Sequence, residues 1–400
     1  MANTPNFLTK DYKNLLDYIY RYGNKTFSEK AFTDVDALVF SALSYIHFES
    51  FLSLVKPFKA LTIKEACLKY FHYLTVDIFA SYPDWMKKSL FLALALVETR
   101  RYSNCKICDF NEVFSTKREA QFAAFDILLN PSYDLVVYRG TDTSVTGWKE
   151  DFNLCYQPYI PSQKQALSFL KDAFTRHADQ GLKYILAGHS KGGNLACYAA
   201  SMIEESKQRQ ISKVYSFDGP GQIKEVFDSP GHKRIEDRIV HIVPQDSVIG
   251  ILLSHEKVSY VVEAFDKKDL ISQHDYYTWL VKDDSFVKEK DRTPFSYMLE
   301  NTFNDWLVNR LEPKEREELI NAFFDIIEKL GITSSEEVFG DYPSFILKFI
   351  RRLNKENKKQ KAVVKRALKS LVMSFKDSIP VYNKYLREQK QALKLVKRSA

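Results

Sequence analysis

One short turn constrains this chain of 400 residues more than any other feature. The apolar run Ile185-Leu-Ala187 predicts a buried strand, Gly188-His-Ser-Lys-Gly192 follows it directly, and small residues of helical composition come next. A Gly-x-Ser-x-Gly turn between a strand and a helix is a nucleophile elbow, whose strained backbone lifts the serine hydroxyl above the sheet edge. We therefore expect Ser190 to be a nucleophile, with Gly188 and Gly192 leaving room for the crowded turn. The alternative is a glycine-rich turn that binds an anion or nothing.

The spacing of apolar residues changes twice along the chain and divides it into three regions. Residues 1–115 and 286–400 have the spacing of helices, whereas strands alternate with helices in residues 116–285. Such alternation predicts a mostly parallel central sheet with helices on both faces. We therefore predict an α/β fold of the α/β-hydrolase type, with its catalytic core in residues 116–285 and helical additions at both ends. The loop from Asp142 to Ser162 is a candidate lid.

A serine hydroxyl becomes a good nucleophile only when a base takes its proton and an acid orients that base. In α/β-hydrolases the acid and then the histidine follow the serine along the chain, each at the carboxyl end of a strand. Asp246 follows the predicted strand 239–243 and is the preferred acid. Asp218, which follows the strand directly after the elbow, is the alternative. It stands in Asp218-Gly-Pro-Gly221, a sequence typical of turns.

The expected base is His274, which follows the last predicted strand, residues 258–263. His255 is a weaker alternative, because it lies only nine residues after Asp246 and before that last strand. The sequence therefore predicts a Ser190–Asp246–His274 triad.

The negative oxygen that forms during acyl transfer needs two backbone N–H donors. The residue after the nucleophile, Lys191, supplies one, and the loop after an early strand supplies the other. Arg139-Gly-Thr141 occupies that loop, so we expect the Thr141 N–H to face the site, with its hydroxyl available as a third donor. Arg139 is expected to anchor the loop through a carboxylate. The charge of Lys191 beside the nucleophile suggests a polar or anionic substrate.

Three motifs resemble, in the same order, those of the class 3 (fungal-type) lipases. They are an oxyanion strand, the serine elbow and a strand end, at Tyr138-Arg-Gly-Thr-Asp142 (followed by Trp148 and Asp151), Gly188-His-Ser-Lys-Gly-Gly-Asn-Leu-Ala196 and Ser216-Phe-Asp-Gly-Pro-Gly221. The wider pattern, which includes Asp36-Ala-Leu38 and Gln273-His-Asp-Tyr-Tyr-Thr-Trp279, is similar to the bacterial Mbeg-like branch of that superfamily.

This resemblance implies ester hydrolysis through an acyl-enzyme on Ser190, with Asp246 and His274 completing the triad. No cofactor or metal ion is expected, and the substrate would be an ester or a lipid-like small molecule. Lys191 and Asn194 stand where the family has leucine and alanine, which makes the elbow more polar and disfavours a triacylglycerol substrate. Two alternatives stay open: an acyltransferase that uses the same triad, and a non-catalytic protein of this fold that binds membrane or nucleic acid through its tail.

The end of the chain differs in charge from the rest. The last 50 residues hold 16 Lys and Arg against three Asp and Glu, whereas the net charge of the whole chain is +7. Apolar residues at helical spacing run from Val363 to Phe375, and a weaker stripe follows Pro380. A basic amphipathic tail of this kind, residues 355–400, packs on its own domain or contacts an anionic membrane. We expect no nucleic-acid partner, because no recognition module is visible.

Cysteine content and hydropathy bear on metal binding and location. The chain has five cysteines, and Cys105-Lys-Ile-Cys108 is a lone CxxC pair without a second pair to complete a zinc site. The first 11 residues lack the pattern of a signal peptide. The longest apolar run, residues 90–97, is far shorter than the roughly 20 residues of a membrane span. We therefore expect a cytoplasmic protein without bound metal, either free or peripheral to the inner face of the membrane.

Overall fold

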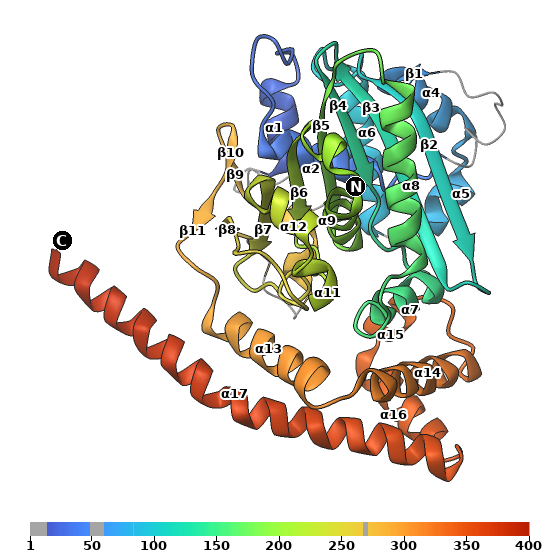
Figure 1. Cartoon of the computed structure of the whole chain (residues 1–400), viewed down its shortest axis with the longest axis vertical. Coiled ribbons are helices and arrows are strands. Elements are labelled where there is room, and N and C mark those ends of the chain that lie inside the picture. Colours follow the sequence, from blue (N-terminus) through green and yellow to red (C-terminus); the bar gives the residue numbers. More distant parts are fainter. Residues whose placement is uncertain (1–13, 49–59, 83, 267–270, 400) are drawn as a thin grey trace.

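A computed structural model describes residues 14–48, 60–82, 84–266 and 271–399 (Figure 1). The first 11 residues, in which we expect no signal peptide, fall outside these ranges. Within them, no helix is long and apolar enough to cross a membrane.

A sheet of nine strands forms the centre of the described structure. Its order is β1 (Leu61–Thr62), β2 (Lys106–Ser115), β3 (Ala120–Asn130), β4 (Tyr133–Tyr138), β5 (Lys183–His189), β6 (Ile211–Phe217), β7 (Ile239–Pro244), β8 (Tyr260–Val262) and β11 (Lys288–Glu289). The five central strands, β4 to β8, are parallel, and the pairs toward both edges are antiparallel. A separate hairpin joins β9 (Val281–Lys282) and β10 (Ser285–Phe286). The predicted α/β fold with a parallel centre is confirmed.

The sheet extends further toward the N-terminus than we predicted. Strand β2 lies within a region that we expected to be helical, and it pairs with β3 over almost its whole length. Its residues are mostly half-exposed, because β2 lies near the sheet edge, so it lacks the clear apolar alternation that identifies a strand. Strands β1 and β11 are two residues long and leave even less signal.

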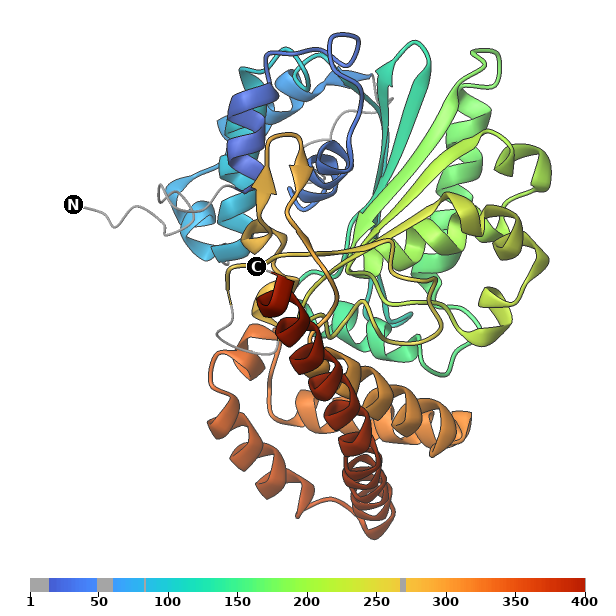
Figure 2. The ribbon, with the colours of Figure 1, turned by 90° about the vertical axis from the view of Figure 1, so that its left-hand side faces the viewer.

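Both faces of the sheet are buried, as the edge-on view shows (Figure 2). Side chains of β5 alternate between the two faces, Ile185 and Ala187 on one, Tyr184 and Leu186 on the other. The first face packs against helices from the N-terminal region: α1 (Leu15–Tyr22), α2 (Asp34–Leu43), α4 (Ile63–Tyr73) and α6 (Asp84–Val97). The second packs against α8 (Pro161–Arg176), α9 (Lys191–Met202) and α12 (Pro230–Ile235). Four short helices connect these elements: α5 (Val76–Ser81), α10 (Glu205–Gln208), α11 (Lys224–Phe227) and α15 (Glu336–Phe339).

A buried ion pair fixes the N-terminal helices to one another. Asp36, in the first turn of α2, caps that helix together with Thr33. Its carboxylate also accepts hydrogen bonds from Arg101 Nε at 2.7 Å and from the Tyr102 hydroxyl at 2.6 Å. Arg101 in turn donates to backbone carbonyls of the loop between α1 and α2, including Lys30. One carboxylate therefore sets how α1, α2 and the end of α6 meet.

The C-terminal helices lie beyond the carboxyl ends of the parallel strands (Figure 1). They are α13 (Pro294–Asn304), which continues as a π-helical turn (Asp305–Asn309), α14 (Pro313–Lys329), α16 (Tyr342–Leu353) and α17 (Lys358–Ser399). The segment 142–162, our candidate lid, contains a helix, α7 (Val145–Asn153), instead of forming an open loop. On α7 the Trp148 ring lies 5.7 and 5.4 Å from the rings of Phe323 and Phe324 on α14. The C-terminal region is thus packed against α7.

The basic tail forms one helix that continues through Pro380, from the first apolar stripe into the weaker stripe that follows it. Helix α17 has 42 residues and includes Pro380 in its interior. A proline there removes one backbone hydrogen bond and normally kinks or ends a helix. Packing on both sides compensates for this loss: Ser378 is buried before the proline, and after it Tyr385 stacks on Tyr297 of α13 at 3.9 Å.

Candidate active site

The predicted elbow is present between β5 and α9. Ser190 has a left-handed backbone with φ of +57°, a conformation that is costly for a residue with a side chain. A Cβ at Gly188 would lie 2.2 Å from the carbonyl carbon of Gly192, and a Cβ at Gly192 would lie 2.2 Å from the Tyr138 carbonyl oxygen. Both glycines are therefore required by close backbone approach. Ser190 is half-buried at the carboxyl end of β5.

His274 pairs with Asp218, the acid that we ranked second. The Nδ1 atom of His274 lies 2.7 Å from Asp218 Oδ2. Asp218 is fully buried directly after β6, and its other oxygen accepts hydrogen bonds from the Ser247 hydroxyl and the Gly250 N–H. Its backbone is also left-handed, with φ of +45°. Strand β6 is the immediate neighbour of β5, so its carboxyl end lies beside the elbow.

Asp246 was the wrong choice for the partner of His274. It follows β7, one strand further from the elbow, and its Oδ2 accepts a hydrogen bond from Gln273 Nε2 at 2.9 Å. Gln273 Oε1 accepts a hydrogen bond from the Asp246 N–H at 3.0 Å, and the Thr293 hydroxyl donates to Asp246 Oδ1. Asp246 therefore holds the residue next to His274 rather than His274 itself.

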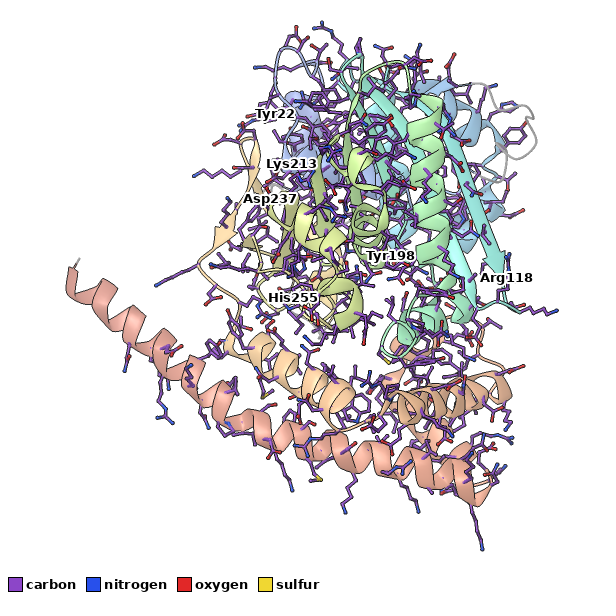
Figure 3. The ribbon with its side chains drawn as sticks, in the orientation of Figure 1. Tyr22, Arg118, Tyr198, Lys213, Asp237 and His255 are labelled. Carbon is purple, nitrogen blue, oxygen red and sulfur yellow. The ribbon has the colours of Figure 1, made fainter. Side chains whose placement is uncertain are left out.

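The other histidine that we considered as a base lies apart from this pair. His255, labelled in Figure 3, has its Nε2 3.3 Å from Glu300 Oε1 on α13. Hydrogen bonding to Glu300 outweighs burial and raises the pKa of His255. Its contacts are those of a histidine that ties α13 to the core.

Next to the His274–Asp218 pair, His189 and Tyr45 form a hydrogen-bonded support. His189 Nε2 lies 2.9 Å from the carbonyl oxygen of His274, and its Nδ1 lies 2.9 Å from the Tyr45 hydroxyl. A carbonyl only accepts, so Nε2 carries the proton and Nδ1 accepts from the tyrosine. Burial lowers the pKa of His189 well below its ordinary value and keeps the ring neutral, as this arrangement requires. Sequence reasoning missed Tyr45, since nothing in the pattern near α2 relates it to residues 144 positions away.

Within the described residues, the Ser190 hydroxyl makes no hydrogen bond to His274. Catalytic hydrogen bonds are often long without substrate and shorten when it binds. The His274 side chain is 24% exposed, so it remains accessible to a substrate.

The predicted oxyanion donors are the backbone N–H groups of Thr141 and Lys191. Among the residues that the structure describes, neither the Thr141 N–H nor the Lys191 N–H has an acceptor. The Thr141 hydroxyl does not serve as a third donor to the site, because it donates to Asp151 on α7 at 2.6 Å. Burial, opposed chiefly by the charge of Lys191, raises the pKa of Asp151 to about 6. Arg139 anchors the loop mainly through carbonyl oxygens, those of Ser44 and Ile46, with Glu112 at a longer 3.9 Å.

The charge of Lys191 points away from the nucleophile. Its side chain is 1% exposed, and Nζ donates to Glu150 Oε2 at 3.0 Å and to both oxygens of Gln121 at 2.8 and 2.9 Å. Glu150, on α7, is fully buried and also accepts from Ser162. The Lys191 charge therefore gives no support for a polar or anionic substrate, since this ammonium is already neutralised inside the protein.

The sequence profile of the Mbeg1-like family matches residues 96–325, more than half of the chain. The crystal structure of M37 lipase is similar to this chain with a TM-score of 0.32 and 15% sequence identity, over 55% of this chain and 70% of that one. A similarity this low carries no argument about activity. No curated protein matches the sequence.

We predict that Lys191→Met destabilises the fold by about 3–5 kcal/mol, because it leaves the Glu150 carboxylate buried without a countercharge. The double variant Lys191→Met/Glu150→Gln should regain part of that loss, since it removes the uncompensated charge as well. The free energies of unfolding in urea test this, with Lys224→Met as the control, because Lys224 is an exposed lysine paired with Asp228. If Lys191→Met and Lys224→Met lower the free energy of unfolding equally, the buried ion pair contributes no more to stability than an exposed one.

Proposed function

The chain belongs to the Mbeg1-like family, and we propose that it is a serine hydrolase that cleaves carboxylic esters. One observation carries the proposal: the strained elbow of Ser190 lies on the strand next to a buried Asp218 that is hydrogen-bonded to His274. Unpaired N–H groups at Thr141 and Lys191 on the flanking segments add the oxyanion donors that such a reaction needs.

The proposed reaction begins with attack of Ser190 Oγ on the ester carbonyl carbon. His274 Nε2 takes the serine proton, while Asp218 accepts the hydrogen bond from Nδ1–H and stabilises the imidazolium. The Thr141 and Lys191 N–H groups stabilise the oxyanion. His274 then returns the proton to the leaving alcohol, which departs and leaves an acyl group on Ser190. Water, activated by the same histidine, hydrolyses that acyl-enzyme and restores the serine.

Two hydrogen-bonded supports hold His274 for this role. Asp246 fixes the side chain of Gln273 through two hydrogen bonds, and His189 donates to the His274 carbonyl oxygen. Rigid supports matter because a misplacement of about 1 Å costs on the order of 10²-fold in rate. Asp246 is therefore a positioning residue in this proposal.

The substrate that we propose is an ester of a small or lipid-like acyl group. The Lys191 ammonium is buried, so the charge nearest the nucleophile in sequence does not select an anionic substrate. Transfer of the acyl group to an alcohol would use the same residues, and analysis of products with added alcohol separates the two reactions.

We predict that a fluorophosphonate probe labels the wild-type protein and that short-chain nitrophenyl esters are hydrolysed. Ser190→Ala should abolish labelling, and Ser190→Ala and His274→Ala should each lower kcat by at least about 10⁴-fold, because the triad acts as a unit. His255→Ala serves as the control and should leave kcat nearly unchanged, since His255 pairs with Glu300. An unlabelled wild type, or undiminished turnover by Ser190→Ala, would overturn the proposal.

The two aspartates should differ in their effect on turnover. Asp218→Asn should lower kcat by about 10⁴-fold, because an amide favours the wrong tautomer of His274. Asp246→Asn keeps the shape but loosens Gln273, so we expect a loss of about 10²-fold or less. Steady-state kinetics on the same ester measures both, after circular dichroism has shown both variants to be folded. A larger loss for Asp246→Asn would return Asp246 to the triad.

A further inference from the structure

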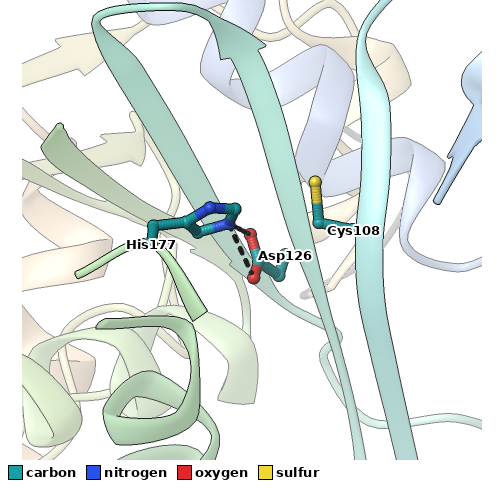
Figure 4. A group of neighbouring side chains, drawn as sticks. All are labelled: Cys108, Asp126 and His177. Carbon is teal, nitrogen blue, oxygen red and sulfur yellow. Dashed lines mark hydrogen bonds and ion pairs between the residues drawn. The ribbon is translucent and has the colours of Figure 1, made fainter. Parts of the chain in front are cut away.

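A second polar cluster lies toward the amino ends of the parallel strands, whereas Ser190 lies at their carboxyl ends. It brings together Cys108 on β2, Asp126 on β3 and His177 at the end of α8, whose ligand atoms all lie within 4.8 Å of one another (Figure 4). Asp134, at the amino end of β4, adds a carboxylate 4.0 Å from His177 Nε2. The elbow, by contrast, follows the carboxyl end of β5.

Asp134 has no hydrogen-bond partner within the described structure. It is fully buried, and both of its carboxylate oxygens are unpaired, as is His177 Nδ1. Buried polar atoms without partners are rare in folded proteins, and each calls for an explanation such as a bound ion. The nearby Arg176 does not fill this role, because its guanidinium pairs with Asp126 and Asp109. A further cation is what this carboxylate lacks.

A bulge in β2 places Cys108 in the cluster. The pairing of β2 with β3 shifts between Ile107↔Ile127 and Asp109↔Asp126, which leaves Cys108 as an extra residue. Successive side chains of a regular strand point to opposite faces, so Cys108 and Asp109 would otherwise diverge. Bulges re-aim a side chain in this way.

We propose that Cys108, Asp126, Asp134 and His177 bind a divalent metal ion, preferably zinc. A thiolate, an imidazole and carboxylates are a donor set that zinc accepts, and neighbouring ligand atoms around tetrahedral zinc lie about 3.3–3.6 Å apart. His177 Nε2 is 3.3 Å from Asp126 Oδ2 and 4.0 Å from Asp134 Oδ1, and Cys108 lies within 4.8 Å of the Asp126 and His177 ligand atoms, so metal binding would draw these side chains closer together. Four protein ligands leave no open position, so the ion would be structural, joining three strands to the end of α8.

Zinc in the protein as purified tests this proposal. We expect about one equivalent per chain by mass spectrometry, and a chelator should lower Tm. Cobalt(II) should give the absorption of a tetrahedral thiolate complex. Cys108→Ser should abolish the sulfur-to-cobalt absorption band. Both Cys108→Ser and Asp134→Asn should weaken metal binding by at least about 10²-fold. Cys155→Ala, a buried cysteine outside the cluster, is the matched control.

Two results would overturn the metal site. One is a wild type without metal whose Tm responds neither to the chelator nor to added zinc. The other is retention of the cobalt band in Cys108→Ser. In either case Asp134 is explained instead as a protonated carboxyl that shares its proton with Asp126, since burial and the Asp126 charge raise the pKa of Asp134.

An independent feature is the outer face of α17, which runs along the side of the molecule away from the sheet (Figure 1). One face of this helix is buried against α13 and α14, at Val363, Ala367, Ser374 and Ser378. The Trp306 Nε1–H donates to the Ala367 carbonyl oxygen at 3.0 Å and helps to fix the rotation of the helix. The opposite face is consequently held outward (Figure 3).

The outward face carries an apolar stripe with lysines beside it. Leu368, Val372, Phe375 and Ile379 recur at the spacing of one helix face and are 42–54% exposed. Lys365, Lys369 and Lys376, all exposed, flank the stripe. Asp377, an acidic residue on this helix, is neutralised by Arg310. Exposed apolar residues in a continuous stripe mark an interaction surface, and the lysines select an anionic one.

We propose that this face of α17 lies on an anionic membrane surface. Apolar side chains would enter the headgroup region while the lysines attract acidic lipids. Helix α13 joins this surface to the hydrolase site, because Thr293, which caps α13, donates to Asp246. Membrane binding would therefore hold the edge that carries His274 close to the lipid, whether or not the ester is itself a lipid.

Vesicle sedimentation of the full chain tests this surface. We expect binding to vesicles of phosphatidylcholine with phosphatidylglycerol, weakened by salt, and none to phosphatidylcholine alone. Changing Lys365, Lys369 and Lys376 together to Glu should weaken binding by about 10²-fold or more. The matched control changes three exposed lysines elsewhere, Lys117, Lys183 and Lys257, to Glu. Equal loss in the two triple variants, or binding to a DNA duplex in preference to vesicles, would overturn the proposal.

Discussion

The buried ion pair between Lys191 and Glu150 holds together the parts of this site that come from different places in the sequence. Lys191 begins α9 directly after the nucleophile, and Glu150 lies on α7. Both bind β3 as well, through Gln121. The next residue of α7, Asp151, fixes Thr141 and with it the oxyanion loop. Burying such a pair is expensive, so its benefit lies in defining one arrangement of these elements.

The same helix connects the site to the end of the chain. Trp148 packs between α7 and α14, and Val145 donates to the Thr333 carbonyl oxygen. The segment 142–162 is therefore held from two sides, by the Glu150–Lys191 pair and by the C-terminal helices. A lid in this position would have to break the contacts with α14 before it could move.

Local sequence patterns were enough to predict the elbow and the alternation of strands and helices, because each leaves a signal within a few residues. The choice between Asp218 and Asp246 depends on which strand lies beside β5 and on the direction in which each carboxylate points. The spacing of neighbouring residues in the sequence predicts neither. Asp218 looked like a turn residue because it is one: its left-handed backbone is what directs the carboxylate to His274. The charge of Lys191 misled for a related reason, since its partner on α7 is 41 residues away.

The N-terminal region contacts the site at several points: Lys88 pairs with Asp275, and the carbonyl oxygens of Ser44 and Ile46 accept hydrogen bonds from Arg139. Tyr45 lies just after α2, donates to His189 and thereby supports the carbonyl of His274, while Asp36 and Arg101 fix α2 itself. The machinery for this chemistry is thus not contained in any continuous stretch of the chain. A fragment that began at residue 116 would keep Ser190, Asp218 and His274, yet lose strands β1 and β2, the helices that cover one face of the sheet and the Tyr45 hydroxyl. Residues 1–115 are therefore an integral part of the sheet and its core rather than a separable addition to them.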